Sequence, residues 1–483
     1  MTDTNTTPVA FVRDAMLAEK SPPVTSSGPI GWLRSNLFPN AFSSILTIVA
    51  LYFIYKIVSG AFPWFANGVW DTPSLAACRE VLQGTVGGCF SVLTERWNQL
   101  LFGFTYPEEH YWRPALAFVL LSVAVVPLMF MNHMEKATKG LAIALAVLGV
   151  LVLIIGSAAQ GIVVVLIAGA VFAASIMAKS DAKKVRGWML MTTAIYPFLA
   201  FWLIWGGTIL TPVFAALGFV GGYIAFTKLE KQSFAMGLIG GVIAAFVVWW
   251  VSGFISGALP GFLALEAIPS RDMGGFMLNF ILGVVCVSLS IPLGIVLALG
   301  RQSDMPIIKG ICVVFIEFIR GVPLITLLFV ANVVLAYFLP PGTTFDLILR
   351  VIIMITMFSA AYIAEVIRGG LAALPKGQYE AGDSLGLDYA QNMRLIILPQ
   401  ALKISIPGIV NVAVGLFKDT ALVSVISMFD LVGMIRGPIL ASAEWNGVYW
   451  ELFGFAALLF FVVCYGISQY SQWLERQLAT GHR

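Results

Sequence analysis

Charge is the scarcest property of this 483-residue sequence. Only 11% of its residues are Asp, Glu, Lys or Arg, against about 25% in a soluble domain, whereas 59% are hydrophobic. So few charges over this length exclude an ordinary soluble protein and favour an all-α polytopic membrane protein. The net charge of +3 is too small to indicate binding to nucleic acid.

Metal-binding and nucleotide-binding patterns are also missing. The three histidines, His110, His133 and His482, lie far apart in the sequence, and no CxxC or HExxH occurs, so we expect no metal site. No GxxxxGK[ST] phosphate loop is present, which excludes an ATPase of that class. We therefore expect a chain that is not catalytic by itself and holds no cofactor of its own.

Long apolar runs fill most of the chain. A spanning helix needs about 20 mainly apolar residues, and the pattern predicts twelve spans, seven before residue 272 and five after it. They run over Phe42 to Ser59, Arg113 to Met131, Gly140 to Gly156, Ile162 to Met177, Trp188 to Trp205, Pro212 to Phe226, Phe234 to Phe254, Phe276 to Leu299, Val313 to Leu339, Leu347 to Val366, Ile404 to Val425 and Val448 to Gln469.

Three parts follow from this pattern. Residues 1–40 are polar and rich in Thr, Ser and Pro, and we expect a disordered cytoplasmic tail. Residues 41–272 are expected to form a transmembrane scaffold with an outside loop at 61–112, and a second transport path is the alternative. Residues 273–483 form the remaining part.

The basic residues of the short loops predict the orientation of the chain. One alternating set of loops is rich in them and the other is poor, so the rich set is expected to be cytoplasmic. This places both termini and the loop at 376–399 inside. The basic residues of the rich set are Lys136, Lys139, Lys179, Lys183, Lys184, Arg186, Lys228, Lys231, Arg301, Lys309, Arg368, Lys376, Arg394 and Lys403.

The loop at 376–399 contains EAGDSLGLDYAQNMRLIILP, a polar insert in an apolar sequence. Gly386 stands where a short helix would end in a residue able to adopt positive φ. Asp388 is expected to cap a second short helix, with Gln391 as its capping-box partner, and Pro399 to end that helix. An ordinary loop between two spans is the alternative.

The motif residues Glu380, Ala381, Gly382, Gly386, Leu398 and Pro399 resemble the EAA loop of ABC-importer permeases, with Gly382 in place of the second Ala. From about Met273 onward the chain resembles polar amino acid permeases. The segments FIRGVPL from Phe318, AEVIRGG from Ala364 and KDTALVSVI from Lys418 contribute to this likeness. The longer N-terminal half, with Cys78, Cys89 and the stretch FGFTYPEEHYWRP, resembles the general L-amino acid permeases of the Aap/Bzt type.

The resemblance implies a type I ABC-importer transmembrane domain of five core helices, preceded here by about seven more. It implies a permease subunit in the bacterial inner membrane that imports acidic amino acids and their amides, or a broad set of L-amino acids. The implied partners are ATPase subunits that bind ATP and Mg, a second homologous permease and a periplasmic amino acid-binding protein. Alternating access would be driven through the EAA loop. An ion-coupled secondary transporter and a structural or sensory membrane subunit are the rival classes.

Ionisable residues at membrane depth mark a polar path or a pair. Lys418, Asp419, Thr420 and Ser424 interrupt an apolar span, and Thr420 and Ser424 would share a helical face. Lys418 and Asp419 could bind the two charges of an amino acid, or could be an internal pair that fixes packing.

Two further pairs have the i, i+3 spacing of helical neighbours, Glu317 with Arg320 and Glu365 with Arg368. We expect both to be structural, with Pro323 acting as a hinge just beyond the first, and a role in binding substrate is the alternative.

Cys78 and Cys89 share the predicted outside loop, and an oxidising periplasm favours a disulfide between them. Two free thiols are the alternative.

Overall fold

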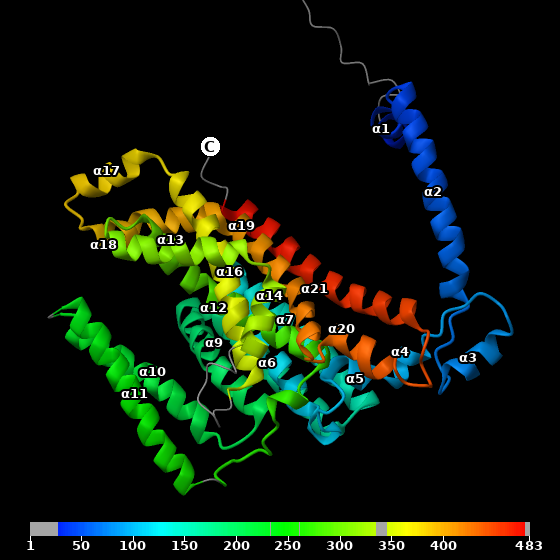
Figure 1. Cartoon of the computed structure of the whole chain (residues 1–483), viewed down its shortest axis with the longest axis horizontal. Coiled ribbons are helices and arrows are strands. Elements are labelled where there is room, and N and C mark those ends of the chain that lie inside the picture. The colour runs from blue at the N-terminus through cyan, green and yellow to red at the C-terminus, as the bar shows by residue number, and fades with distance from the viewer. Residues whose placement is uncertain (1–27, 232, 260, 335–344, 479–483) are drawn as a thin grey trace, which may run out of the picture. The chain divides into compact units, whose positions relative to one another are not determined.

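The computed structural model describes residues 28–231, 233–259, 261–334 and 345–478. Within these ranges the regular secondary structure is helical, apart from three isolated β-bridges (Figure 1). The predicted all-α class is confirmed.

Eleven helical segments of the described chain are long and apolar enough to cross a membrane. Each corresponds to one of the predicted spans. They contain α2 (Ala41–Ala66), α6 (Trp112–Met129), α7 (Met134–Ile155), α8 (Ala158–Ser180), α9 (Ala182–Trp205), α10 (Leu210–Leu229), α11 (Phe234–Ala258), α12 (Gly275–Gln302), α16 (Leu347–Ala372), α19 (Leu398–Asp419) and α21 (Tyr449–Leu478).

The predicted span from Val313 to Leu339 is not a single straight helix. Helix α13 (Pro306–Gly321) begins seven residues earlier, and α14 (Leu324–Phe329) follows it after a bend of 103°. Pro323, which cannot donate a backbone hydrogen bond, lies at the break with the extended Val322 before it. The helix is therefore broken at Pro323 and not only kinked there. The last residues of the predicted span, 335–339, lie outside the described ranges.

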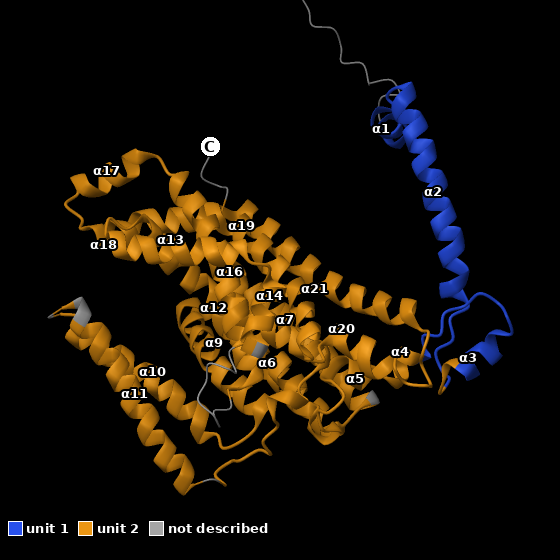
Figure 2. Ribbon diagram, viewed as in Figure 1, with its two compact units in different colours: residues 1–72, 76–91 blue, residues 73–75, 92–483 orange. Residues whose placement is uncertain are grey.

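Contacts divide the chain into two compact units (Figure 2). The first comprises residues 1–72 and 76–91. Residues 28–36 of the predicted disordered tail form helix α1 (Gly28–Asn36), where Ile30, Trp32 and Leu33 supply apolar surface suited to a membrane interface. Helix α2 has no buried residue, as expected of a helix surrounded by lipid.

The loop that follows α2 is held together by a covalent link. Cys78 on α3 (Leu75–Leu82) and Cys89 form a disulfide with a Cα–Cα distance of 6.0 Å. Phe90, next to Cys89, stacks on Trp70 with ring centroids 4.7 Å apart. The structure therefore confirms the predicted disulfide between the two cysteines.

The second unit comprises residues 73–75 and 92–483. Its largest apolar core joins Tyr106, Ala117 and Leu203 from before residue 272 to Met277 and Leu282 after it. The predicted division at 272/273 is thus not an edge between compact units of the described chain, because the scaffold and the C-terminal helices share one core.

Small residues allow the C-terminal helices to pack closely. A Cβ atom on Gly294 of α12 would lie 2.6 Å from Cγ2 of Ile363 on α16, closer than real contacts permit. Helices α16 and α19 are joined by the Ser405 hydroxyl, which donates to the Val366 carbonyl at 3.3 Å. The three helices form the base from which the polar loop at 376–399 projects.

Candidate functional site

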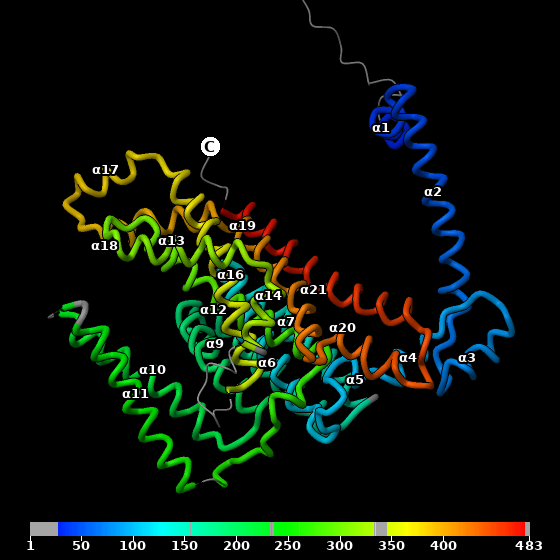
Figure 3. Tube along the Cα trace, viewed as in Figure 1, coloured from blue at the N-terminus to red at the C-terminus, as the bar shows by residue number. Residues whose placement is uncertain are grey.

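The polar loop leaves α16, turns through two short helices and returns into α19 (Figure 3). Helix α17 (Lys376–Ser384) ends before Gly386, whose φ is +72°. Helix α18 (Tyr389–Asn392) begins at Asp388, which accepts from the Gln391 amide at 2.7 Å while the Gln391 side chain accepts from the Asp388 amide. Both local predictions, the glycine at the turn and the capping box, are confirmed.

Pro399 has a different place from the predicted one. A π-helical turn (Met393–Ile397) leads from α18 directly into α19, so Pro399 stands in the first turn of the long helix and does not end a short one. Proline lacks the amide that would bond to the preceding turn, and the departure from regular α-helix at Met393–Ile397 accommodates this loss. The loop is therefore continuous with a spanning helix.

One side of the loop is fixed to the protein and the other is free. Met393, Ile397 and Ala401 are buried in a core with Ile367 and Leu371 of α16. This anchoring suits a rigid element that moves together with α16 and α19.

On its free side the loop combines charge with exposed apolar surface. Glu380 and Ala381 are exposed, and Leu385, Tyr389 and Leu395 are 73%, 67% and 64% exposed. A charged rim around large apolar side chains is typical of a protein-binding surface. Leu398, at the end of the motif, is half-buried.

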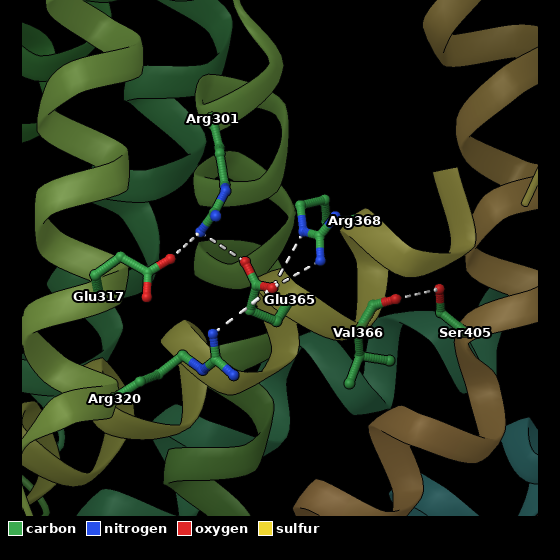
Figure 4. Close-up of polar contacts among 7 residues, drawn as sticks. All are labelled: Arg301, Glu317, Arg320, Glu365, Val366, Arg368 and Ser405. Carbon is green, nitrogen blue, oxygen red and sulfur yellow. Dashed lines mark hydrogen bonds and ion pairs between the residues drawn. The ribbon is translucent and has the colours of Figure 1, made fainter. Parts of the chain in front are cut away.

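Glu365 on α16 is the centre of an ion-pair network (Figure 4). Its carboxylate lies 2.7 Å from Arg301 of α12, 3.6 Å from Arg320 of α13 and 3.1 Å from Arg368 of α16. Arg301 also contacts Glu317 of α13 at 2.9 Å.

The predicted pair of Glu365 and Arg368 is present, but the predicted pair of Glu317 and Arg320 is replaced. Glu317 binds Arg301 and Arg320 binds Glu365, so each side chain of that predicted pair connects α13 to another helix. The Arg320 guanidinium also lies over the Tyr362 ring, 5.5 Å from its centroid. The network ties three helices together just before the break at Pro323.

The four predicted path residues lie where α19 gives way to a 3₁₀ segment, Thr420–Ile426. Lys418 is exposed, Asp419 is half-buried, and no ion pair within 4.0 Å joins them in the described structure. Thr420 is fully buried and donates to the Phe417 carbonyl at 2.7 Å. Ser424, half-buried, does not share its helical face, because four residues of a 3₁₀ helix turn through more than one full turn.

Comparison with known proteins decides the family. Residues 290–478 match the family described as binding-protein-dependent transport system inner membrane component. The chain is 43% identical to the glutamate/glutamine/aspartate/asparagine transport system permease protein BztC of Rhodobacter capsulatus, over 98% of this chain and 99% of that protein. It is 32% identical to the inner membrane amino-acid ABC transporter permease protein YhdY of Escherichia coli, over 94% and 95%.

The chain belongs to the ABC importer permeases. A crystal structure of an amino acid ABC transporter with histidines is 32% identical and covers 42% of this permease and 92% of that chain, with a TM-score of 0.38. BztC and YhdY match nearly the whole permease, so its N-terminal helices have counterparts in them. The permease is the membrane subunit of its transporter and not the ATPase.

A buried polar cluster of the permease was not predicted. Asn279 of α12 donates to Thr420 and to Asp430, each at 3.0 Å, and accepts from the Leu431 amide at 3.0 Å. Burial raises the pKa of Asp430 to about 6, and the hydrogen bonds it accepts from Asn279, Gly433 and Val432 oppose that shift. A lone Asn in an apolar span was the only sequence signal of this cluster.

The expectation of no metal site was based on the wide spacing of the histidines in the sequence and on the missing CxxC and HExxH patterns. The fold nevertheless brings the His110 Nε2 atom to 2.9 Å from Glu266 and 4.0 Å from Glu109. Both carboxylates are largely exposed, and the hydrogen bond between His110 and Glu266 joins two segments that lie far apart in the sequence.

Proposed function

We propose that this permease imports amino acids with acidic side chains and their amides, driven by ATP that a separate ATPase binds together with Mg. The observation that supports it most is the full-length match to BztC, a permease named for glutamate, glutamine, aspartate and asparagine. A second homologous permease and a periplasmic amino acid-binding protein complete the proposed transporter. The proposed location is the bacterial inner membrane, with both termini cytoplasmic.

The ATPase is proposed to bind the loop formed by α17 and α18. Leu385, Tyr389 and Leu395 would enter an apolar groove, and Glu380 would face positive charge or backbone donors. Because Met393 and Ile397 anchor the loop in the same core as α16, displacement of the loop would move the spans. That rigid connection is what coupling to ATP hydrolysis requires.

The substrate path is proposed to pass Lys418 and Asp419. An amino acid needs a cation for its carboxylate and an anion for its ammonium group. The exposed Lys418, without an acidic partner within 4.0 Å in the described structure, suits the first role. Thr420 is assigned instead to packing, since its hydroxyl is buried against Asn279.

Transport by reconstituted vesicles tests the proposal. The permease, its ATPase and its partner permease are placed in vesicles with the binding protein outside, and uptake of labelled glutamate, glutamine, aspartate and asparagine is measured. Uptake should require ATP and be indifferent to ion gradients; uptake driven by a gradient without ATP would establish a secondary transporter instead. Glu380→Lys should abolish uptake and ATPase binding while the protein still reaches the membrane.

A further inference from the structure

Basic residues gather at one end of the helices α7, α8 and α9. Helix α7 begins there, α8 ends there and α9 begins there, so residues from two separate stretches of the chain meet. Met134, Ala178, Val185 and Met189 form a small buried core at this end. The exposed cations around it are Lys136, Lys139, Lys179, Lys183, Lys184 and Arg186, named below the basic patch.

The carboxylates at this end are already engaged. Glu135 pairs with Lys179 at 3.3 Å, and Asp181 caps α9 by accepting from the Lys184 amide at 3.0 Å. On α7, α8 and α9, six cations thus stand beside two carboxylates, so these three helix ends keep a positive excess. The turn between α10 and α11 differs, because its Lys228 and Lys231 flank Glu230.

The position of the patch indicates the chemistry of its partner. All three helices are candidate spans, so their ends lie at the level of the lipid headgroups. Trp188, nearly two turns into α9 and 46% exposed, marks an interfacial position, and the Lys184 ammonium lies 5.5 Å from the centre of its ring. Ammonium and guanidinium groups at this depth face phosphates.

We propose that the basic patch binds the headgroup phosphate of anionic phospholipids, which thereby fasten the N-terminal helices to the membrane surface. Two segments about 40 residues apart supply the charges, so a bound headgroup would also hold the start of α7 beside the turn between α8 and α9. This inference rests on the membrane location and the patch alone. It does not depend on which amino acid is transported.

Lipid titration of the purified transporter complex tests the proposal. Wild type is compared with Lys183→Gln/Arg186→Gln, and with Lys228→Gln/Lys231→Gln as a control that removes the same charge elsewhere. Each complex in neutral detergent receives phosphatidylglycerol or phosphatidylcholine, and thermal stability and lipid retained in native mass spectrometry are measured. Each basic residue near the surface is worth about fivefold in affinity, so the patch variant should bind phosphatidylglycerol roughly 25-fold more weakly.

The expected result is stabilisation by phosphatidylglycerol and not by phosphatidylcholine, lost in the patch variant and kept in the control variant. Equal stabilisation by phosphatidylcholine would overturn the proposal. So would equal loss in the two variants, which would indicate attraction by net charge alone. An equal effect of inorganic phosphate would overturn the assignment to lipid. Unchanged ATP-driven uptake in the patch variant would leave the proposed function intact, so the two ideas fail separately.

Discussion

The side chain of Asn392 fills the space that a side chain at Gly382 would need. Gly382 is buried in α17, and Asn392, the last residue of α18, donates to the Tyr379 carbonyl at 3.3 Å. This contact fixes the angle between the two short helices. It also explains why glycine replaces alanine in this copy of the motif.

Gly382→Ala is therefore expected to destabilise the loop although it brings the motif closer to the family pattern. Overpacking of this kind costs about 1–3 kcal/mol. Asn392→Ala in the same chain should relieve it, at the loss of one hydrogen bond worth about 1 kcal/mol. Affinity for the ATPase, measured on the single and double variants, checks this; an additive loss in the double variant would contradict it.

Glu365→Gln should destabilise the permease far more than Glu317→Gln. The Glu365 side chain is 16% exposed and faces three arginines, whereas that of Glu317 is 54% exposed and faces one. Removing the central carboxylate leaves the guanidinium groups uncompensated, at a cost on the order of 2–3 kcal/mol, because they retain some water. The exposed pair is worth about 0–1 kcal/mol.

Thermal unfolding of the purified complex measures both changes. The two substitutions remove the same charge and keep the same shape, so they form a matched pair. Equal shifts in melting temperature would show that Glu365 is not the centre of a cooperative network.

The features predicted correctly from the sequence are those that a few neighbouring residues determine. The capping box needs only Asp388 and Gln391, three positions apart, and its prediction held. The i, i+3 rule found Arg368 as a partner of Glu365 for the same reason. It failed for Glu317, because its partner Arg301 is 16 positions away on another helix and only the packing of α12 against α13 brings them together.

Changes in backbone geometry within a membrane span could not be predicted from the sequence either. The apolar pattern is the same for α-helical and 3₁₀ segments, so the shared face of Thr420 and Ser424 was wrong. Pro323 did signal a bend, but its angle of 103° depends on how α14 packs against α16. The apolar pattern predicts that a membrane span is present, whereas tertiary contacts determine where that span bends and which type of helix it forms.

Gly386→Val is expected to abolish ATP-driven uptake, whereas Gly377→Val should not. Both glycines have open space around them, but only Gly386 has a positive φ, +72°. A β-branched residue is strained in that conformation, so the turn between α17 and α18 would be lost. Uptake is measured at equal membrane expression, and a comparable defect in both variants would show that bulk and not backbone conformation matters.

Cys78 and Cys89 should resist alkylation until the protein is reduced. Their Cα atoms are 6.0 Å apart in a loop closed over eleven positions. A link of this loop length contributes about 3 kcal/mol to stability, so Cys78→Ser and the double serine variant should lose the same amount. Mass spectrometry of alkylated peptides decides it, and complete labelling without reductant would exclude the bond.

Lys418→Met should reduce uptake strongly while assembly and basal ATPase activity persist. The lost ammonium would leave the substrate carboxylate unpaired, a loss on the order of 2–5 kcal/mol if the contact is desolvated. Lys403→Met is the matched control, since Lys403 is an exposed lysine of the same helix and lies near its other end. The Lys403→Met variant should transport amino acids at the wild-type rate.

The double variant Lys418→Met/Asp419→Leu separates binding from packing. No ion pair within 4.0 Å joins these two residues in the described structure, so Lys418→Met breaks no close ion pair of Asp419. If Lys418 binds substrate, the double variant stays inactive, because the cation is still missing. If the two residues act as an internal pair, Lys418→Met should impair assembly and the double variant should restore assembly and uptake together. Uptake and assembly measured on these variants therefore distinguish a residue of the path from a residue of the core.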